Sequence, residues 1–261
     1  MLFYSKLAME NLYLSFPPNS IAENAIRLDA QAIPGEIIAI NKPAGTPAEK
    51  IVAEINKRIA EKQPSFCALA LERAYLVYAC EPEISGLMLV AGTQTYARWR
   101  DALGSNLFNF HFEFLSKRVP AIENEFYCDL PVAKHFNEEC AVISSTTGKK
   151  SRTQFKRIAT GTAFEKWEAT TTFPRFHQIR IHAFECEIPV VADPIYDGVP
   201  APTIASLRPK KRLNKGEDKA FYPNICLHLA RIETTLDGNA FVFSAPTPKG
   251  LATLEKKLGL E

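Results

Sequence analysis

Short segments rich in β-branched and aromatic residues recur along this chain, and they constrain its fold more than any other feature. Turns that contain glycine, proline or polar residues separate these segments, as is typical of a sheet with short connections. The predicted strands are residues 36–41, 75–80, 87–91, 108–115, 125–130, 152–158, 167–172 and 240–244.

Helical patterns are fewer. Residues 51–62 place Ile51, Ile55 and Ile59 at helical spacing, with charged residues between them. Residues 93–103 are expected to be helical, 177–186 helical or mixed, and 252–258 a terminal helix. Taken together, the predicted strands and helices indicate an α+β fold with a largely antiparallel, mixed sheet and flanking helices.

The chain has 261 residues, of which 46% are hydrophobic, and this is enough to bury a full core. Residues 1–33 consist of short apolar pieces that are broken by prolines, and we interpret them as an N-terminal extension. Residues 34–261 are expected to form the main domain, which includes a basic loop at 198–224.

Overall charge does not identify a partner, because 31 Lys and Arg against 29 Asp and Glu leave a net charge of +2. Residues 208–215 nevertheless concentrate five basic side chains, among them Lys210, Lys211 and Arg212. These three are candidate phosphate contacts. A solvated loop that binds nothing is an equally good interpretation of such a run.

Six cysteines lie far apart without any C-x-x-C pair, which argues against a zinc site and against a disulfide framework. We expect them to be reduced. No stretch approaches the roughly 18 apolar residues of a membrane span. The sequence therefore predicts a cytoplasmic protein without a metal and without membrane contact.

Five motifs occur in one order along the chain. They are Asn41-Lys42-Pro43-Ala44-Gly45, residues 84–91 (ISGLMLVA), residues 177–182 (HQIRIH), residues 189–196 (PVVADPIY) and Leu227-His228. Together they resemble the RNA pseudouridine synthases that act on large-subunit ribosomal RNA and tRNA. The resemblance covers roughly residues 34–251.

The resemblance implies a pseudouridine synthase fold with a central RNA-binding cleft. Such enzymes flip a uridine out of its stack, break its glycosidic bond, turn the uracil and rejoin it through carbon. They use no cofactor and no metal, and their partner is RNA. For the oligomeric state we expect a monomer.

The family's catalytic residues are carried over by position. The motif around Ser85-Gly86 places Glu81 where the family has its essential aspartate, and Arg180 matches the arginine that pairs with that carboxylate. Leu227 matches an apolar residue near the base. Val119 stands where the family has a stacking tyrosine, and Ala79 replaces an arginine that enters the RNA stack.

Four further residues are candidate substrate contacts by the same motifs, namely Lys42, Arg175, His177 and Gln178. Lys42 and His177 also have an ordinary structural interpretation. Lys42 would then be a turn lysine, and His177 a buried, hydrogen-bonded histidine, because its spacing from His182 does not suit a metal site.

Three hypotheses follow. The first is uridine isomerisation that uses Glu81, with activity reduced or lost, because the extra methylene shifts the carboxylate by over ~1 Å. The second is a non-catalytic RNA-binding protein that retains the fold. The third is a scaffold repurposed for another ligand, which the apolar Val119, Cys80 and Phe176 favour.

Overall fold

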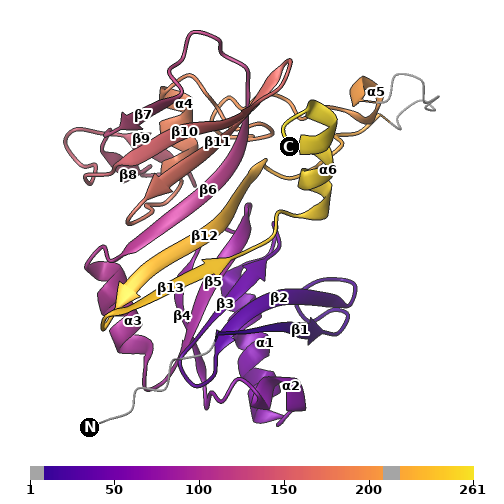
Figure 1. Cartoon of the computed structure of the whole chain (residues 1–261), viewed down its shortest axis with the longest axis vertical. Coiled ribbons are helices and arrows are strands. Elements are labelled where there is room, and N and C mark those ends of the chain that lie inside the picture. Colours follow the sequence, from indigo (N-terminus) through magenta and orange to yellow (C-terminus); the bar gives the residue numbers. More distant parts are fainter. Residues whose placement is uncertain (1–8, 208–217) are drawn as a thin grey trace. The chain divides into compact units, whose positions relative to one another are not determined.

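The computed structural model describes residues 9–207 and 218–261, and these divide into two compact units. Unit 1 comprises Met1–Phe108 and Arg231–Pro246, and unit 2 comprises Asn109–Ala230 and Thr247–Glu261. Each unit combines antiparallel strands with helices (Figure 1). The α+β class that the sequence predicts is therefore confirmed.

Unit 1 contains a run of four antiparallel strands in the order β1–β2–β3–β5, with β4 also paired to β5. The strands are β1 (Glu10–Phe16), β2 (Ile26–Ile33), β3 (Ile37–Lys42), β4 (Ala74–Ala79) and β5 (Ser85–Gly92). In addition, β13 (Asn239–Ser244) pairs with Arg231–Leu236 of β12 (Leu227–Leu236). The segment expected as an N-terminal extension thus contributes β1 and β2, which pair in sequence with β3.

Among its described residues, unit 1 has the helices α1 (Ala48–Ala60), α2 (Pro64–Cys67) and α3 (Tyr96–Gly104) (Figure 1). Helix α1 buries Ile51 and Ile55, as its spacing predicts. Its Asn56 side chain also makes two hydrogen bonds to the backbone of Ala74, at 2.8 and 3.0 Å. Packing and polar contacts together therefore attach α1 to the start of β4.

Unit 2 contains a second antiparallel run in the order β6–β11–β10–β7, and a separate hairpin of β8 and β9. The strands are β6 (Phe108–Lys117), β7 (Glu125–Cys128), β8 (Val132–Lys134), β9 (Ala141–Ile143), β10 (Thr153–Thr160) and β11 (Phe164–Thr171). Along β11 every second residue from Glu165 to Thr171 is buried. This alternation is what one face packed on a core produces.

The helices of unit 2 are α4 (Gln178–Glu185), α5 (Ile204–Leu207) and α6 (Lys249–Leu258). Helix α4 contacts β9 and β10, and its residues from Gln178 to Ala183 are all buried. Helix α6 packs through Leu251 and Leu254, while Glu255 accepts an ion pair from Lys166 of β11 at 3.2 Å. Helix α4 is thus an interior element of unit 2, and it carries most of the H-Q-I-R motif.

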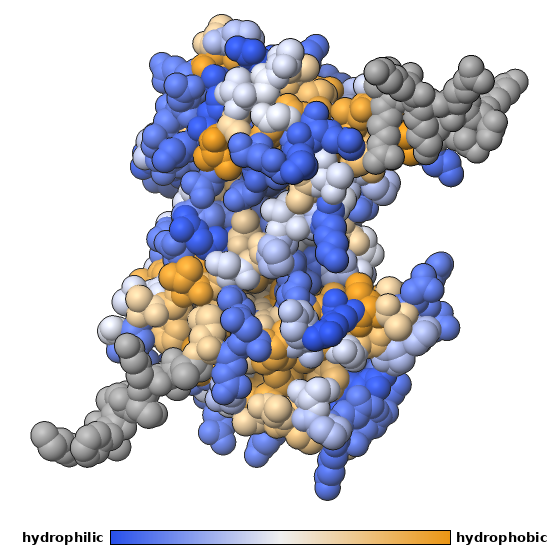
Figure 2. All heavy atoms as spheres, turned by 45° about the vertical axis from the view of Figure 1, so that its right-hand side comes forward, coloured by the Kyte–Doolittle hydropathy of each residue, from blue (hydrophilic) through white to orange (hydrophobic). Residues whose placement is uncertain are grey.

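On the face that Figure 2 shows, hydrophilic residues predominate and hydrophobic ones form small patches between them. Within residues 9–207 and 218–261, no helix has both the length and the apolar character that crossing a membrane requires.

Candidate active site

In unit 1, the side chain of Lys42 is fully buried at the end of β3. Its ammonium group donates to four backbone carbonyl oxygens, those of Ile84 at 2.7 Å, Pro43 at 3.2 Å, Glu81 at 3.2 Å and Pro82 at 3.3 Å. An ammonium has three N–H donors, so these bonds are shared and the donors are fully used. Lys42 therefore fixes the backbone of the loop that carries Glu81.

A second contact closes this loop from the other side. The backbone N–H of Gly45 donates to the carbonyl of Pro82 at 2.7 Å, and Gly45 has a φ of 79°, a conformation that glycine adopts readily. Lys42 itself lies opposite Gly86 in the β3–β5 register. The two motifs that the sequence singled out in this unit thus form one hydrogen-bonded pair of loops, with Glu81 half-buried at its edge.

Burial also affects the ionisable neighbours of Glu81. It lowers the pKa of Lys42, although the charges of Cys80 and Glu81 oppose this effect. Burial raises the pKa of the Cys80 thiol to about 12. Burial also raises the pKa of Tyr78, and the negative charge of Glu81 raises it further. The Cys80 thiol and the Tyr78 phenol are therefore uncharged near neutral pH.

In unit 2, Arg180 forms a bidentate ion pair with Asp193. Its Nε lies 2.6 Å from one carboxylate oxygen and its Nη2 lies 2.8 Å from the other. The side chains are 1% and 0% exposed. Two parallel, charge-assisted bonds in a buried setting hold the guanidinium in a defined position.

Arg180 also donates from Nη1 to Nε2 of His177 at 2.7 Å. Because that ring nitrogen accepts, Nδ1 carries the proton and donates to the Tyr196 hydroxyl at 3.0 Å. Burial, and then the Arg180 charge, lower the pKa of His177 to about 4. His177 is therefore a neutral link between Arg180 and Tyr196.

His177 also has an unusual backbone. Its φ is 52° at the start of α4, and its ring stacks on that of Phe176 with the centroids 3.9 Å apart. The family's glycine is missing from this stretch of the sequence, and here the left-handed turn is made by a histidine whose side chain is bonded on both sides.

The neighbouring Gln178 is buried and its amide is engaged on both ends. Its nitrogen donates to the Arg152 carbonyl and to the hydroxyls of Thr153 and Thr171, and its oxygen accepts the Arg175 N–H at 3.0 Å. Gln178 thus connects α4 to β10 and β11. It also holds the backbone of Arg175, two residues before the left-handed turn at His177.

Arg175 lines a pocket of about 340 Å³ that lies within unit 2. The other lining residues are Val132, Ala133, Lys134, Thr147, Lys149 and Phe176. Within the described part of the chain, the buried Nε of Arg175 has no hydrogen-bond partner. Three cations and an aromatic ring thus surround this pocket, while Glu139 offsets part of the charge through an ion pair to Lys134 at 2.9 Å.

The remaining predicted site residues lie in different places. Val119 is half-buried in the loop after β6, where Arg157 donates to the neighbouring Ile122 carbonyl at 2.8 Å. Leu227 is 1% exposed at the start of β12, in unit 2. Lys210, Lys211 and Arg212 lie outside the described residues.

Two site residues escaped the sequence analysis, which used the motif at 189–196 without assigning roles within it. They are Asp193, the buried partner of Arg180, and Tyr196, the partner of His177. An aspartate inside an otherwise apolar stretch was the signal, because a buried carboxylate needs a cation. Glu81 belongs to unit 1 and Arg180 to unit 2, so their pairing stays a prediction.

A possible metal-ligand group occurs on the β8–β9 turn, where His135, Glu138 and Cys140 place ligand atoms within 4.8 Å of one another. The Nδ1 atom of His135, however, already accepts the backbone N–H groups of Asn137 and Glu138, at 3.3 and 3.1 Å. The lone pair on this nitrogen is therefore occupied, and we assign no metal here.

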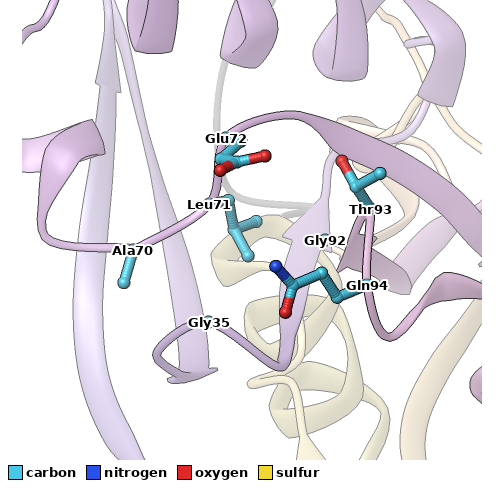
Figure 3. Close-up of a pocket in the computed structure, with 7 residues that line it drawn as sticks. All are labelled: Gly35, Ala70, Leu71, Glu72, Gly92, Thr93 and Gln94. Atoms are coloured by element: carbon cyan, nitrogen blue, oxygen red, sulfur yellow. The ribbon is translucent and has the colours of Figure 1, made fainter.

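Figure 3 shows a smaller pocket of about 180 Å³ in unit 1, between the β2–β3 turn and the end of β5. Its lining residues are Gly35, Ala70, Leu71, Glu72, Gly92, Thr93 and Gln94. Glu72 is the one ionisable side chain among these seven, so the lining offers no acid–base pair.

Two solved structures resemble this one over most of their length. Human RNA pseudouridylate synthase domain containing 4 matches with a TM-score of 0.67 at 16% identity, over 87% of this chain and 91% of its own. Human RNA pseudouridylate synthase domain containing 1 matches with a TM-score of 0.61 at 16% identity, over 85% and 84%. At such identities the likeness concerns the fold, and it confirms the predicted pseudouridine synthase fold.

Sequence relatives carry a related name, ribosomal large subunit pseudouridine synthase D. The protein from Buchnera aphidicola is 24% identical over 91% of this chain, and that from Xanthomonas campestris is 24% identical over 85%. The protein from Xylella fastidiosa is 27% identical over 66%.

The chain spans 75%, 66% and 55% of the length of these three relatives, in the same order. No family model matches the chain. The five ordered motifs, the relatives and the fold nevertheless agree with one another, and they support the RNA pseudouridine synthase family for this chain.

Proposed function

We propose that this chain isomerises uridine to pseudouridine in a structured RNA, ribosomal RNA or tRNA, by flipping the target base. Glu81 takes the place of the catalytic aspartate, and Arg180 that of its partner. The observation that carries the proposal is that hydrogen bonds fix both sets of family motifs, the loop of Glu81 through Lys42 and the Arg180 side chain on α4 through Asp193 and His177.

The loop that holds Glu81 supports this role. Lys42 and Gly45 fix its backbone through four hydrogen bonds to carbonyl oxygens of residues 81–84. A catalytic carboxylate has to be held in place before the substrate arrives, because small displacements are costly in rate. We propose that Lys42 acts here as a positioning residue rather than as a direct contact to RNA.

The partner arginine is equally well fixed. Asp193 and His177 together bind Nε, Nη1 and Nη2 of Arg180. The neutral state of His177 removes one positive charge from this neighbourhood. We propose that Arg180, held in this way, fills the position of the arginine that pairs with the catalytic carboxylate in the family.

The pocket around Arg175 supports RNA as the partner. Lys134, Lys149 and Arg175 supply positive charge for phosphate groups, and Phe176, at 36% exposure, adds a partly exposed ring beside them. Together with Lys210, Lys211 and Arg212, these side chains would let the protein bind RNA through phosphate contacts that do not depend on sequence.

We propose that the protein acts as a monomer in the cytoplasm.

Two departures from the family lower the expected rate. The longer side chain of Glu81 displaces the carboxylate by over ~1 Å, and this can cost on the order of 100-fold. Val119 cannot stack on uracil, which removes roughly 1–3 kcal/mol of base binding. We therefore expect slow turnover, or none, on the natural substrate.

The deciding experiment compares the unaltered protein with Glu81→Asp, Val119→Tyr and the double variant on total RNA. Pseudouridine formation is mapped across ribosomal RNA and tRNA. Product from the unaltered protein supports a working enzyme. Product from the double variant alone identifies a silenced synthase, and no product from any variant contradicts isomerisation. Arg180→Lys in the double-variant background is the matched inactive control.

A second candidate function is RNA binding without catalysis, and Ala79 and Val119 favour it. In the family these positions hold an arginine that enters the RNA stack and a ring that stacks on the base. Their joint loss removes catalytic contacts but leaves the cations around Arg175 in place. Salt-dependent RNA binding without product formation would support this function, and absence of RNA affinity would exclude both.

A further inference from the structure

Glu165 of β11 carries a fully buried carboxylate that the candidate active site does not use. Its side chain is 0% exposed, and its Oε2 atom lies 3.3 Å from Nε of Arg157 on the neighbouring strand β10. Within residues 9–207 and 218–261, neither carboxylate oxygen of Glu165 has a hydrogen-bond partner. Burial of a charge is costly unless an opposite charge lies close to it, so Glu165 depends on Arg157.

Arg157 is held by more than this ion pair. Its Cζ atom lies 4.8 Å from the centroid of the Trp167 ring, and Trp167 donates from Nε1 to the Ser116 hydroxyl at 3.0 Å. The pairing of β10 with β11 also shifts its register between Arg157 and Ala159. Such a β-bulge bends the strand and redirects a side chain. The bulge and the indole ring together fix the direction in which the Arg157 side chain points.

The Arg157 side chain and backbone both bind the loop that follows β6, residues 118–124, which we call the β6 loop. Nη2 of Arg157 donates to the Ile122 carbonyl at 2.8 Å, and its backbone N–H donates to the Asn124 carbonyl at 2.7 Å. Inside the loop, the Ile122 N–H donates to the Val119 carbonyl at 3.2 Å. Arg157 therefore holds the β6 loop and, through Ile122, the backbone of Val119.

The strand that leads into the β6 loop is bonded to the segment that carries Asp193. The Leu115 carbonyl, near the end of β6, accepts the Val191 N–H at 2.8 Å. Asp193 follows shortly after and is the buried partner of Arg180. All of these residues belong to unit 2. The β6 loop therefore begins close to the Arg180 pair.

We propose that Arg157 and Glu165 are positioning residues, which hold the β6 loop so that the side chain of residue 119 meets a flipped base in a fixed geometry. A buried ion pair adds little stability compared with apolar side chains of similar size, whereas it can specify one conformation. The hold on the loop follows from the contacts described above, and its role in base binding rests on the proposed isomerisation.

The first test separates the order of the loop from overall stability. Arg157→Met and Glu165→Met each leave one buried charge unpaired, so both should lower the urea midpoint of unfolding. The variant with both changes should recover most of that loss, because apolar side chains of similar length replace the whole pair. Amide hydrogen exchange at Ile122 should nevertheless stay faster by about 10-fold, since the Ile122 carbonyl then lacks its donor.

A second ion pair provides the matched control. Arg58 and Glu54 of α1 are 12% and 11% exposed and lie in unit 1. Arg58→Met with Glu54→Met should leave hydrogen exchange in the β6 loop unchanged. If the variant without Arg157 and Glu165 regains both its stability and slow exchange at Ile122, the pair only supports the fold and the proposal is wrong. This result requires no activity toward RNA.

The second test asks whether the loop acts on the base. In a chain with Glu81→Asp, Val119→Tyr should increase pseudouridine formation on the order of 10-fold, because a ring can stack on the uracil. The gain should disappear when Arg157→Met and Glu165→Met are added, since the ring is then misplaced. A gain of equal size with and without the ion pair would contradict a positioning role. If no variant forms pseudouridine, the proposed isomerisation fails, and the hydrogen exchange at Ile122 alone decides whether the pair positions the loop.

Discussion

Arg180 and Asp193 form a two-point ion pair, at 2.6 and 2.8 Å, in which both side chains are almost completely buried. Asp193 Oδ1 also accepts the backbone N–H of Ile195 at 2.9 Å. The carboxylate is therefore bound both by the arginine and by the turn that contains it. A family motif at 177–182 and another at 189–196 are thus joined by one buried contact.

Replacement of Arg180 by methionine should destabilise the protein strongly, because it leaves the Asp193 charge buried without its cation. We expect the free energy of unfolding to fall by about 3–5 kcal/mol, measured by urea denaturation. Arg98→Met is the control, since Arg98 is 40% exposed and its ion pairs lie near the surface. Equal losses in the two variants would contradict a special role for the buried pair.

Lys42→Met tests whether the lysine holds the Glu81 loop. The variant keeps the length of the side chain but leaves buried carbonyl oxygens without a donor, which costs about 1–3 kcal/mol. Amide hydrogen exchange should also accelerate at Ile84 and Gly45, whose N–H groups bond within these loops. Lys57→Met, on the outer face of α1 and 60% exposed, should change neither quantity. Unchanged exchange in Lys42→Met would show that the loop is held by other contacts.

The strands with strong apolar or aromatic content could be predicted from the sequence, and β3, β5 and β6 appear within two residues of their expected bounds. Strands β1 and β2 were not predicted, although Leu14 and Phe16 alternate with polar residues as half-buried strands do. The prolines between them outweighed that signal. Strand β12 escaped because it follows a long irregular segment and lacks a turn motif at its start.

The site could be predicted only in part, for a physical reason. Motif spacing identified Lys42, His177 and Arg180 as special positions. It could not reveal that Lys42 binds carbonyl oxygens or that His177 is bonded on both ring nitrogens, because those partners lie far away in sequence or on the backbone. Chemical type is readable from a sequence, whereas the partner of a polar group depends on tertiary structure.

Protonation of His177 should make stability depend on pH. The folded chain has a pKa of about 4 at this ring against an ordinary value of 6.5, so the unfolded chain binds the proton more readily. Stability should therefore fall as the pH drops from about 6.5 to 4, by roughly 3 kcal/mol from this residue. Urea denaturation across that range measures the effect.

The matching variant is His177→Gln, which should be less stable at pH 7 yet lose most of the slope between pH 4 and 6.5. His135→Gln, on the β8–β9 turn, retains His177 and should keep the slope. A slope that persists unchanged in His177→Gln would assign the acid sensitivity to other groups.

The basic run at 208–215 should contribute to RNA affinity through phosphate contacts alone. Changing Lys210, Lys211 and Arg212 to glutamine should weaken binding to a structured ribosomal RNA fragment and to an unrelated duplex by similar factors, because phosphate contacts carry no sequence information. The slope of log affinity against log salt concentration should decrease by roughly 2–3, since each phosphate contact contributes somewhat less than one. Filter binding at several salt concentrations measures both quantities.

The control changes Lys249, Lys256 and Lys257, which are exposed on α6, and so removes the same charge from another surface. If both triple variants lower the slope equally, net charge rather than this segment determines the interaction, and the run is a solvated loop.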